Sequence, residues 1–383
     1  MIMNIQNTIN NKQEVWIGVD LGTTGVRAIA YDVEGQKYCS SEAFYPLLTP
    51  HPDWAEENPL QIFESVEKVI KETAAELRYK NCLLQGIALS TVMHSFAGLD
   101  EHYEPLMDMQ TWADSRSASI VKEMKQDEKL CRSFYEKTGC PIHACYPLAK
   151  GIWLRRNHPE IFQQMRYVGS LKDYIFRGLT GEWLIDHSAA STSGMYNEKN
   201  MDWDDEILAY AGLRREQMPK IVSTTYMSKL SSQAAAAMEL PEGVPVVIGA
   251  TDGVLVNVGI GAVHPGQLSA TIGTSGALRM LTSQPMTDPK MRTWCYNLVD
   301  DMWVAGGAIN NGGMILRWVR DKICHYTKAH LENLDVDGYD LMTMKASHIP
   351  AGSEGLIMLP CFTGERAPYW NSELRGMFFG LSL

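Results

Sequence analysis

The sequence predicts an α/β protein built from two related halves. Residues 20–25, DLGTTG, and residues 271–276, TIGTSG, each place a Gly-Thr-(Thr/Ser)-Gly turn directly after a β-like run. Strand and helix patterns follow the first turn and restart around the second. The length of 383 residues also exceeds that of one ordinary domain. A duplicated α/β domain would explain why one chain contains the same hydroxyl-lined turn twice.

The first half begins with two β-branched and aromatic runs in residues 15–31 that flank the Gly/Thr turn, a pattern typical of a hairpin. A third strand is expected over residues 37–44. Asn58 and the proline after it are a typical N-cap and first helical residue, so a helix is predicted over residues 59–78. The apolar residues 84–89 predict the next buried strand.

Residues 115–240 are mainly helical patterns joined by loops. Strand patterns return at residues 244–249, 267–272 and 302–305, and a helix is expected within residues 313–327. The domain boundary is predicted just after Asp252 and Gly253, near residues 259–263, which divides the chain into residues 1–258 and an incomplete second domain, 259–383. The apolar end, GMFFGLSL, reads as the middle of a strand or of a strand-to-helix turn.

Composition excludes several classes of protein. The chain is 45% apolar and 21% charged, which is ordinary for a globular protein with a core. A net charge of −11 argues against a nucleic-acid partner, because phosphate binding needs clustered Lys and Arg. Residues 1–14 are polar and lack the apolar segment of a signal peptide. Residues 244–263 are long enough to span a membrane, but the polar Asp252 and Asn257 favour buried strands around a turn, so no membrane partner is expected.

The eight cysteines are spread without paired spacing, which indicates reduced thiols in a cytoplasmic protein. Cys140-Pro-Ile-His143-Ala-Cys145 is the nearest approach to a metal motif. It lacks a second pair of ligands, so zinc is not expected.

The two Gly/Thr turns are candidate phosphate sites. Such a hairpin directs backbone N–H groups and hydroxyls to one side, and glycine lets a phosphate approach the backbone closely. Asp20 ends the strand before the first turn and is suited to hold a hydrated Mg²⁺. One such turn alone is usually structural, whereas two between strands favour phosphate binding. The sequence has no Walker motif.

Longer segments resemble the FGGY carbohydrate kinases. VDLGTTGVRAIAYD and TIGTSG resemble that family's two phosphate segments, and GATDGVLVNVG resembles the segment with its catalytic aspartate. ERAPYWNSELRGMFFGLSL resembles the opening of the C-terminal signature. YPLAKGIWLRRN is similar to the other signature, with Lys150 and Trp153 in place but Cys145 where an aromatic residue, Met, Gly or Ser is usual. The matches run along the whole chain in the expected order.

The resemblance implies a duplicated actin-like, ribonuclease H-like fold with a cleft between its domains, and the use of ATP and Mg²⁺. STVMHSFAGLD, TWADSRS and TGCPIHACYPLAK are most similar to gluconate kinases, which implies D-gluconate as the substrate and 6-phospho-D-gluconate as the product. Family members continue beyond the point where this chain stops. The sequence therefore predicts a C-terminally truncated chain that binds sugar, binds ATP poorly and is a doubtful catalyst.

Alternatives remain open. A xylulose or ribulose kinase would use the same machinery on an uncharged ketose. A non-catalytic actin-like sensor of sugar or nucleotide, or an actin-like filament protein, is also compatible with the fold. The oligomeric state is not fixed by the sequence, with a homodimer as one option.

The resemblance and the chemistry of phosphoryl transfer together assign candidate roles. Asp252, a lone carboxylate between Thr251 and Gly253, is the expected general base, although a turn aspartate can also cap a helix. The other candidates fall into three groups. The candidate sugar ligands are His94, Trp112, Asp114, Arg116, His143 and Lys150. Arg116 or Lys150 would bind the carboxylate of a sugar acid, and about three of the six residues are expected to be true contacts. The candidate nucleotide ligands are Gly22, Thr23, Thr24, Arg27, Gly273, Thr274, Ser275, Gly307 and Asn311, the last two in a Gly/Asn loop before a helix. The candidate metal ligand is Asp20.

Overall fold

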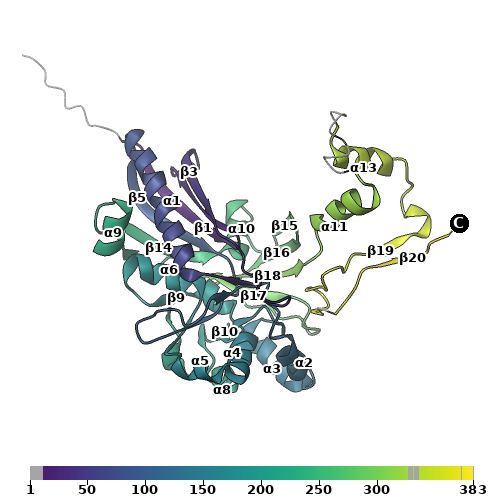
Figure 1. Ribbon diagram of the computed structural model, residues 1–383, viewed down its shortest axis with the longest axis horizontal. Helices are drawn as coiled ribbons and strands as arrows, with labels where there is room; N and C mark the ends of the chain where they lie inside the picture. Colours follow the sequence, from purple (N-terminus) through teal and green to yellow (C-terminus); the bar gives the residue numbers. More distant parts are fainter. Residues whose placement is uncertain (1–11, 327–330, 332–335, 372, 383) are drawn as a thin grey trace, which may run out of the picture.

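Two β-sheets, each with its own helices, organise the chain (Figure 1). The computed structural model describes residues 12–326, 331, 336–371 and 373–382. The prediction about a signal peptide falls mainly on residues 1–11, and Thr327 of the expected helix and the last residue of the chain also lie outside the described residues.

The first sheet has six strands in the order β13-β14-β5-β1-β2-β3. β1, β2 and β3 form an antiparallel meander, β5 and β14 run parallel to β1, and β13 is antiparallel at the edge. The strands are β1 (Glu14–Gly22), β2 (Gly25–Tyr31), β3 (Lys37–Phe44), β5 (Leu83–Thr91), β13 (Met227–Lys229) and β14 (Pro245–Thr251).

Alternation along β1 places Val15, Ile17, Val19 and Leu21 in the core, where they are almost fully buried. The helix α1 (Pro59–Tyr79) lies along the sheet in Figure 1 and contributes a stripe of apolar residues to the same core. It begins as the sequence predicts, because the side chain of Asn58 accepts a hydrogen bond from a first-turn amide.

A helical region is inserted between β5 and β14 and has a second hydrophobic core of its own. Short two-residue and three-residue strands connect its helices. The helices are α2 (Ala118–Met124), α3 (Glu128–Thr138), α4 (Pro147–Asn157), α5 (Pro159–Gln164), α6 (Leu171–Thr180), α7 (His187–Ser191), α8 (Asp205–Ala211) and α9 (Ser232–Met238).

The second sheet is antiparallel, in the order β15-β16-β18-β17. Its strands are β15 (Leu268–Ile272), β16 (Gly276–Thr282), β17 (Trp294–Val299) and β18 (Met302–Ile309). The hairpin β15–β16 with β18 beside β16 repeats the arrangement of β1, β2 and β3, as the duplication predicted. In the described part of the chain no strand pairs with the outer edge of β15, where the first sheet has β5 beside β1.

Two details differ from the sequence prediction. The strand expected at residues 302–305 continues to Ile309, so Gly306 and Gly307 lie inside β18 and not in a loop. β17 was not predicted, although its sequence, WCYNLV, contains aromatic and β-branched residues and follows the turn-like pair Asp288-Pro289.

The second sheet is fastened to the first domain through β17. The amide of Cys295 donates to the carbonyl of Gly139 at 3.0 Å, and the hydroxyls of Tyr146 and Tyr296 are 2.8 Å apart. The indole Nε1 of Trp303, on β18, donates to the buried carboxyl group of Glu198 at 2.8 Å. These contacts hold the second sheet against the helical region of the first domain.

After β18 the chain forms α11 (Gly313–Trp318), a single π-helical turn (Val319–Ile323), α13 (Gly338–Ala346) and the hairpin of β19 (Ile357–Leu359) with β20 (Met377–Phe379). Figure 1 shows these elements extending away from the two sheets. Apolar side chains on β15 and β16 are also exposed, including Leu268, Ile272 and Leu278. The C-terminal part thus leaves more apolar surface uncovered than the first domain.

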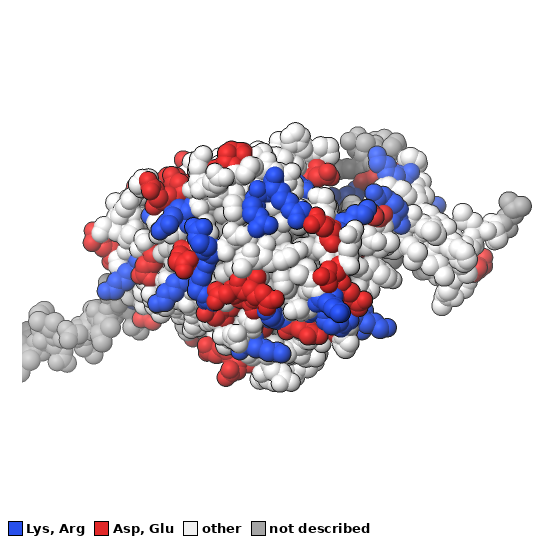
Figure 2. Space-filling view, turned by 90° about the horizontal axis from the view of Figure 1, so that it is seen from below, with Lys and Arg blue, Asp and Glu red and all other residues white. Residues whose placement is uncertain are grey.

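Two features of the structure concern the nucleic-acid and membrane partners that the sequence argues against. On the face shown in Figure 2, Lys and Arg are interspersed with Asp and Glu among many uncharged side chains. Among the described residues, no helix combines the length and the apolar character needed to cross a bilayer.

Gly249 in β14 supplies a test of the fold. Its φ is +68°, and a Cβ there would lie 1.8 Å from the carbonyl oxygen of Leu89 on β5. Gly249→Ala should therefore destabilise the first domain by about 3 kcal/mol, through backbone strain and the clash together. Gly35→Ala, at a φ of +82° but with open space around it, should cost only about 1 kcal/mol. Equal shifts of the urea unfolding transition in the two variants would contradict this packing of β14 against β5.

Candidate active site

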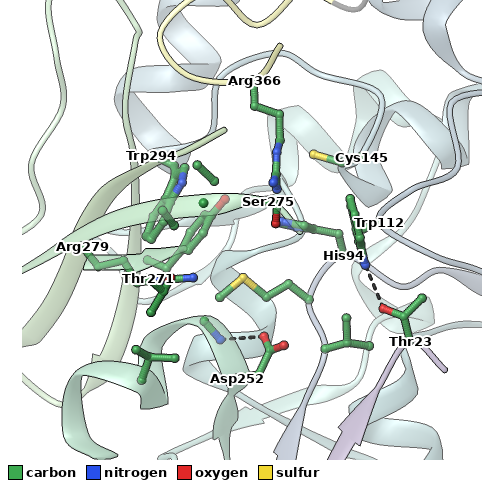
Figure 3. A pocket seen from close by; sticks show the side chains of 18 of the residues that line it. Thr23, His94, Trp112, Cys145, Asp252, Thr271, Ser275, Arg279, Trp294 and Arg366 are labelled. Atoms are coloured by element: carbon green, nitrogen blue, oxygen red, sulfur yellow. Dashed lines mark hydrogen bonds between the residues drawn. The ribbon is translucent and has the colours of Figure 1, made fainter. Parts of the chain in front are cut away.

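A cavity of about 380 Å³ lies between the two sheets, at the end of the first sheet where β1, β5 and β14 finish. Both domains contribute to its wall (Figure 3). The predicted site residues that line it are Thr23, His94, Trp112, Asp252, Gly273 and Ser275. This position is where the topology of a parallel sheet leads one to expect a site.

Asp252 is the first residue of α10 (Asp252–Gly259), directly after β14. Burial raises the pKa of its carboxyl group to about 6, and the negative charge of Asp20 adds to the shift. One carboxyl oxygen accepts a hydrogen bond from the amide of Gly253 at 2.6 Å. Figure 3 shows the carboxyl group at the floor of the cavity. A carboxyl group with this pKa is largely ionised at neutral pH and can still accept a proton.

The first Gly/Thr turn connects β1 and β2 beside this carboxylate. Asp20 accepts a hydrogen bond from the hydroxyl of Ser90 on β5 at 2.8 Å. Thr23 faces the cavity, and its hydroxyl accepts a hydrogen bond from the indole Nε1 of Trp112 at 2.9 Å. Gly22 is fixed through its carbonyl, which accepts from the hydroxyl of Tyr45 at 2.6 Å. The turn is held firmly from its outer side and keeps its inner side toward the cavity.

Thr24 of this turn and Arg27 on β2 lie away from the cavity wall. Thr24 is exposed, at the tip of the hairpin. Arg27 projects from β2 and forms an ion pair with Glu42 on β3 at 2.7 Å, with 57% of its side chain exposed. In this arrangement neither residue contacts the cavity.

The second turn connects β15 and β16, and Gly273 and Ser275 face the cavity. Its carbonyl groups are occupied by the start of α11: Gly273 accepts from the amide of Gly313 at 2.7 Å, and Thr274 accepts from the amide of Gly312 at 3.1 Å. The N-terminus of α11 is therefore closed by the turn. Its amides are not directed at the cavity, as a phosphate site at a helix N-terminus requires.

The predicted Gly/Asn loop is used differently from the expectation. Gly307 lies in β18 and faces an apolar hollow outside the cavity. The side chain of Asn311 is buried, and its amide nitrogen donates to the carbonyl of Gly364 at 2.7 Å and to the carboxyl group of Glu365 at 3.1 Å. These hydrogen bonds fasten residues 364–365 to the second sheet, so the structure does not bring Gly307 or Asn311 to the site.

His94 faces the cavity directly after β5, with a φ of +66° that is uncommon outside glycine. Its Nδ1 lies 2.8 Å from the carbonyl of Thr192, so Nδ1 carries the hydrogen. Burial lowers the pKa of the ring to about 3, so the ring is neutral near pH 7. Nε2 is then a hydrogen-bond acceptor, suited to the hydroxyl of a ligand.

Asp114 and Arg116 lie behind the cavity wall. They are buried against each other, with the guanidinium group 2.7 Å from the carboxyl group of Asp114 and 2.7 Å from that of Glu56. The guanidinium group also stacks on Trp54, 3.5 Å from the ring centre. This network supports the loop that carries Trp112, and the structure does not place either residue at the cavity surface.

Lys150 and His143 are also behind the wall. The ammonium group of Lys150 donates to the carbonyl of His94 at 2.6 Å and to that of Thr111 at 2.7 Å, which joins the two loops that carry His94 and Trp112. Burial lowers the pKa of Lys150 to about 8. His143 accepts a hydrogen bond from the amide of Cys145 at 3.2 Å and lines a separate small cavity.

Sequence reasoning missed two arginines that line the cavity, Arg279 on β16 and Arg366 after the β19 strand. Arg279 donates to the hydroxyl of Thr271 at 2.9 Å, and Arg366 donates to the carbonyl of Ile309 at 3.2 Å. Within the described residues, the Nε of each is buried without a hydrogen-bond partner. Arg366 lies in the segment ERAPYW, which was singled out for its resemblance but not as a site. Arg279 is a single cation in the strand after the second turn, and no sequence motif marks it as a site residue.

Metal ligands are sparse in this structure. Across the described residues, no group of three or more His, Cys, Asp or Glu side chains is placed to hold a metal ion. Cys140 donates from its thiol to the carbonyl of Ser191 at 3.2 Å. Asp252 is the carboxylate that lines the cavity, and Asp20 on β1 is near enough for its charge to add to the effect of burial on the pKa of Asp252.

Comparison with known proteins gives consistent matches over the chain. Residues 15–259 match the N-terminal domain, and residues 268–383 the C-terminal domain, of the FGGY family of carbohydrate kinases. The chain is 39% identical over 368 residues to a gluconokinase of Bacillus subtilis (strain 168), covering 96% of this chain and 71% of that protein. The structure is similar to a gluconate kinase from Lactobacillus acidophilus (TM-score 0.88, 33% identity, 96% of this chain and 73% of that one). It is equally similar to a ligand-bound xylulose kinase from the same organism (TM-score 0.89, 33% identity, with the same coverage).

The paired sheets, the shared cavity and these matches define an ATP-dependent sugar kinase. The chain belongs to the FGGY family of carbohydrate kinases. The predicted family and the predicted actin-like, ribonuclease H-like fold are confirmed. The domain boundary at residue 258 and the homodimer stay predictions.

The role of Lys150 can be tested through stability. Lys150→Met would leave two buried carbonyl groups without a donor and should lower the free energy of unfolding by about 3 kcal/mol. Lys80→Met is the control, because the ammonium group of Lys80 also donates to a backbone carbonyl, that of Tyr38, but on the surface. Its unfolding transition should match that of the wild type. If Lys150→Met were equally stable, the proposed link between the two loops would be wrong.

Proposed function

We propose that this protein transfers the γ-phosphoryl group of ATP to the terminal 6-hydroxyl of D-gluconate, giving 6-phospho-D-gluconate and ADP. In this reaction the sugar oxygen forms a bond to phosphorus while the bond between phosphorus and the β-phosphate oxygen breaks. The proton of the hydroxyl passes to Asp252. The observation that carries the proposal is this carboxylate, facing a cavity lined by a Gly/Ser turn and two arginines.

Each element of the cavity has a separate task. Asp252 is the acceptor for the hydroxyl proton, and its pKa of about 6 keeps it ionised at neutral pH. Thr23, Gly273 and Ser275 present hydroxyl and backbone groups from opposite sides, as a pair of phosphate-binding turns would. His94 accepts a sugar hydroxyl through Nε2, and Trp112 forms an adjacent wall.

Mg²⁺ fits the acidic pair at the cavity. Asp20 and Asp252 repel each other, and a divalent cation bound near Asp20 would relieve that repulsion. Such a cation supplies charge neutralisation for the phosphates of ATP. Ser90 holds Asp20 through one carboxyl oxygen, and the exposed side chain of Asp20 is suited to the water shell of the ion. Closure of the two domains over the cavity would exclude water and limit hydrolysis of ATP.

An acidic sugar is favoured by the charges on the cavity wall. Arg279 and Arg366 both line the cavity, and the Nε of each is buried without a hydrogen-bond partner in the described part of the chain. In Figure 3 Arg366 extends into the cavity from the side opposite to Asp252. An extended sugar acid with its 6-hydroxyl at Asp252 would direct its carboxylate toward Arg366. Arg279 lies next to Asp252 and is suited to the transferring phosphoryl group.

The relatives support this choice without excluding a second one. A gluconokinase is 39% identical to this chain, and a gluconate kinase has a closely similar structure. The xylulose kinase of similar structure favours a pentulose as the second candidate. A neutral ketose would leave the guanidinium group of Arg366 without an anionic partner, so gluconate is the better match.

The general base is tested with Asp252→Asn. The variant should lose turnover by about 10³-fold, because the amide cannot accept the hydroxyl proton, while D-gluconate binding changes by no more than about 3-fold. Production of ADP and titration calorimetry measure the two quantities. Asp301→Asn, at an exposed turn, is the matched control and should behave as the wild type. Turnover that survives in Asp252→Asn would remove Asp252 from the mechanism.

The same carboxyl group predicts the pH dependence. Because the folded pKa of Asp252 is raised to about 6, kcat/KM should fall about tenfold per pH unit below pH 6 and reach a plateau above about pH 7. His94 does not contribute to this limb, since its pKa is lowered to about 3. A rate profile at saturating ATP measures the limb. A plateau that extends down to pH 5 would contradict the assignment.

Arg366→Met tests the acidic substrate. Loss of a charge-assisted hydrogen bond should weaken D-gluconate binding by about 30-fold and change D-xylulose binding by less than about 3-fold. Arg317→Met, at an exposed position on α11, is the control and should bind both sugars normally. Calorimetric titrations with each sugar give the ratio. An equal loss for both sugars would mean that Arg366 contacts something that the two substrates share.

A further inference from the structure

The strand that leads to Asp252 is irregular just before it ends. The pairing of β14 with β5 shifts register between Val247 and Ala250. Gly249 within this bulge has a left-handed backbone, and no side chain could occupy its position because β5 is too close. A bulge changes the direction of the strand and takes carbonyl groups out of the regular ladder. The carbonyl groups of Ile248 and Ala250 therefore need another donor.

Lys172 supplies that donor from α6. Its ammonium group donates to the carbonyl of Ile248 at 2.6 Å and to that of Ala250 at 3.2 Å. The side chain is only 1% exposed, and it does not contribute to the wall of the cavity that contains Asp252. Lys172 is thus placed behind the site and holds the backbone of β14 and not a ligand.

The charge of Lys172 is balanced only in part. Asp186 lies 3.7 Å away, fully buried, and uses one carboxyl oxygen to cap α7 through the amide of Ala189. Its other oxygen has no hydrogen-bond partner among the described residues. Burial lowers the pKa of Lys172, while the charges of Asp186, Asp252 and Asp173 act in the opposite direction. A well-packed apolar pair would avoid this desolvation cost, but it could not bind the two carbonyl groups.

The next residues are held from the same side. The hydroxyl of Ser188, on α7, lies 2.8 Å from the hydroxyl of Thr251 and accepts from the Thr251 amide at 3.1 Å. Lys172 and Ser188 therefore fix three positions, 248, 250 and 251, immediately before Asp252. The direction of the Asp252 side chain depends on this anchored segment.

We propose that Lys172 is a positioning residue for Asp252: its ammonium group binds the two carbonyls of the β14 bulge and thereby aims the carboxylate into the cavity. The inference rests on the proposed function, in which Asp252 is the general base. Lys172 acts through the backbone and has no contact with the sugar or with ATP. Its removal should affect the chemical step more than substrate binding.

The experiment compares Lys172→Met with wild type, with Asp252→Asn and with the surface control Lys80→Met. In Lys172→Met, kcat should fall about 10-fold to 100-fold, because a small misplacement of a catalytic group is costly, while the KM for D-gluconate changes by less than about 3-fold. The acid limb of the rate profile should move to higher pH, since a positive charge near Asp252 is lost. Lys80→Met should match the wild type in all three quantities.

A second variant avoids an unpaired buried charge. Lys172→Met combined with Asp186→Asn keeps the cap of α7 and removes both charges, so the protein should fold and show the same loss of kcat. Hydrogen exchange of residues 245–258 provides a readout that needs no turnover, and it should accelerate in both variants.

The outcomes separate the two proposals. If Asp252→Asn retains turnover, the general base is wrongly assigned and the proposed function fails first. If Asp252→Asn is inactive but the double variant has wild-type kcat and unchanged exchange over residues 245–258, the role of Lys172 is refuted. A parallel loss of kcat and rise in KM with an unchanged acid limb would also refute it, because that is the signature of general loosening.

Discussion

The parallel register of β1, β5 and β14 is the constraint on which the site depends. Thr91, at the end of β5, pairs with Leu21 on one side and with Thr251 on the other. The three strands therefore finish at one level of the sheet, and the residues that follow them meet there. Asp20 and Asp252 lie on opposite sides of β5 and still sense each other's charge. Burial at this end of the sheet raises the pKa of the proposed base, and the charge of Asp20, brought near by the strand order, adds to that shift.

The second sheet completes the cavity because β17 is fixed to the helical region of the first domain. Hydrogen bonds to Gly139, Tyr146 and Ser191 leave β17 little freedom to slide. This attachment turns the β15–β16 hairpin toward the first Gly/Thr turn. Arg279 and Arg366, both from residues after the domain connection, then enter the same cavity as His94 and Trp112. A cation contributed by one domain can in this way meet a ligand that is positioned by the other.

Several buried charges near the site serve the backbone and not a ligand. Lys150 and Lys172 each bind two carbonyl groups, and Arg116 is enclosed by two carboxylates and a tryptophan ring. A buried cation of this kind satisfies carbonyls that loops and a bulge leave without partners. The structure therefore separates two roles that look alike in a sequence. Arg279 and Arg366, whose Nε atoms lack a partner among the described residues, line the cavity, whereas the two lysines, each bonded to two backbone carbonyls, stand behind it.

The sequence by itself determined the family, the duplicated fold, the order of the main strands and the two turns. It also placed Asp20 and Asp252 at strand ends, because strand periodicity, a turn and a carboxylate are local features that a few adjacent residues specify. It did not predict β17, and it did not distinguish Lys150, His143 and Arg116 from true cavity residues. Nor did it find Arg279 or Arg366. Which polar side chains face a common cavity depends on the packing of segments far apart in the chain, and only the tertiary structure decides that.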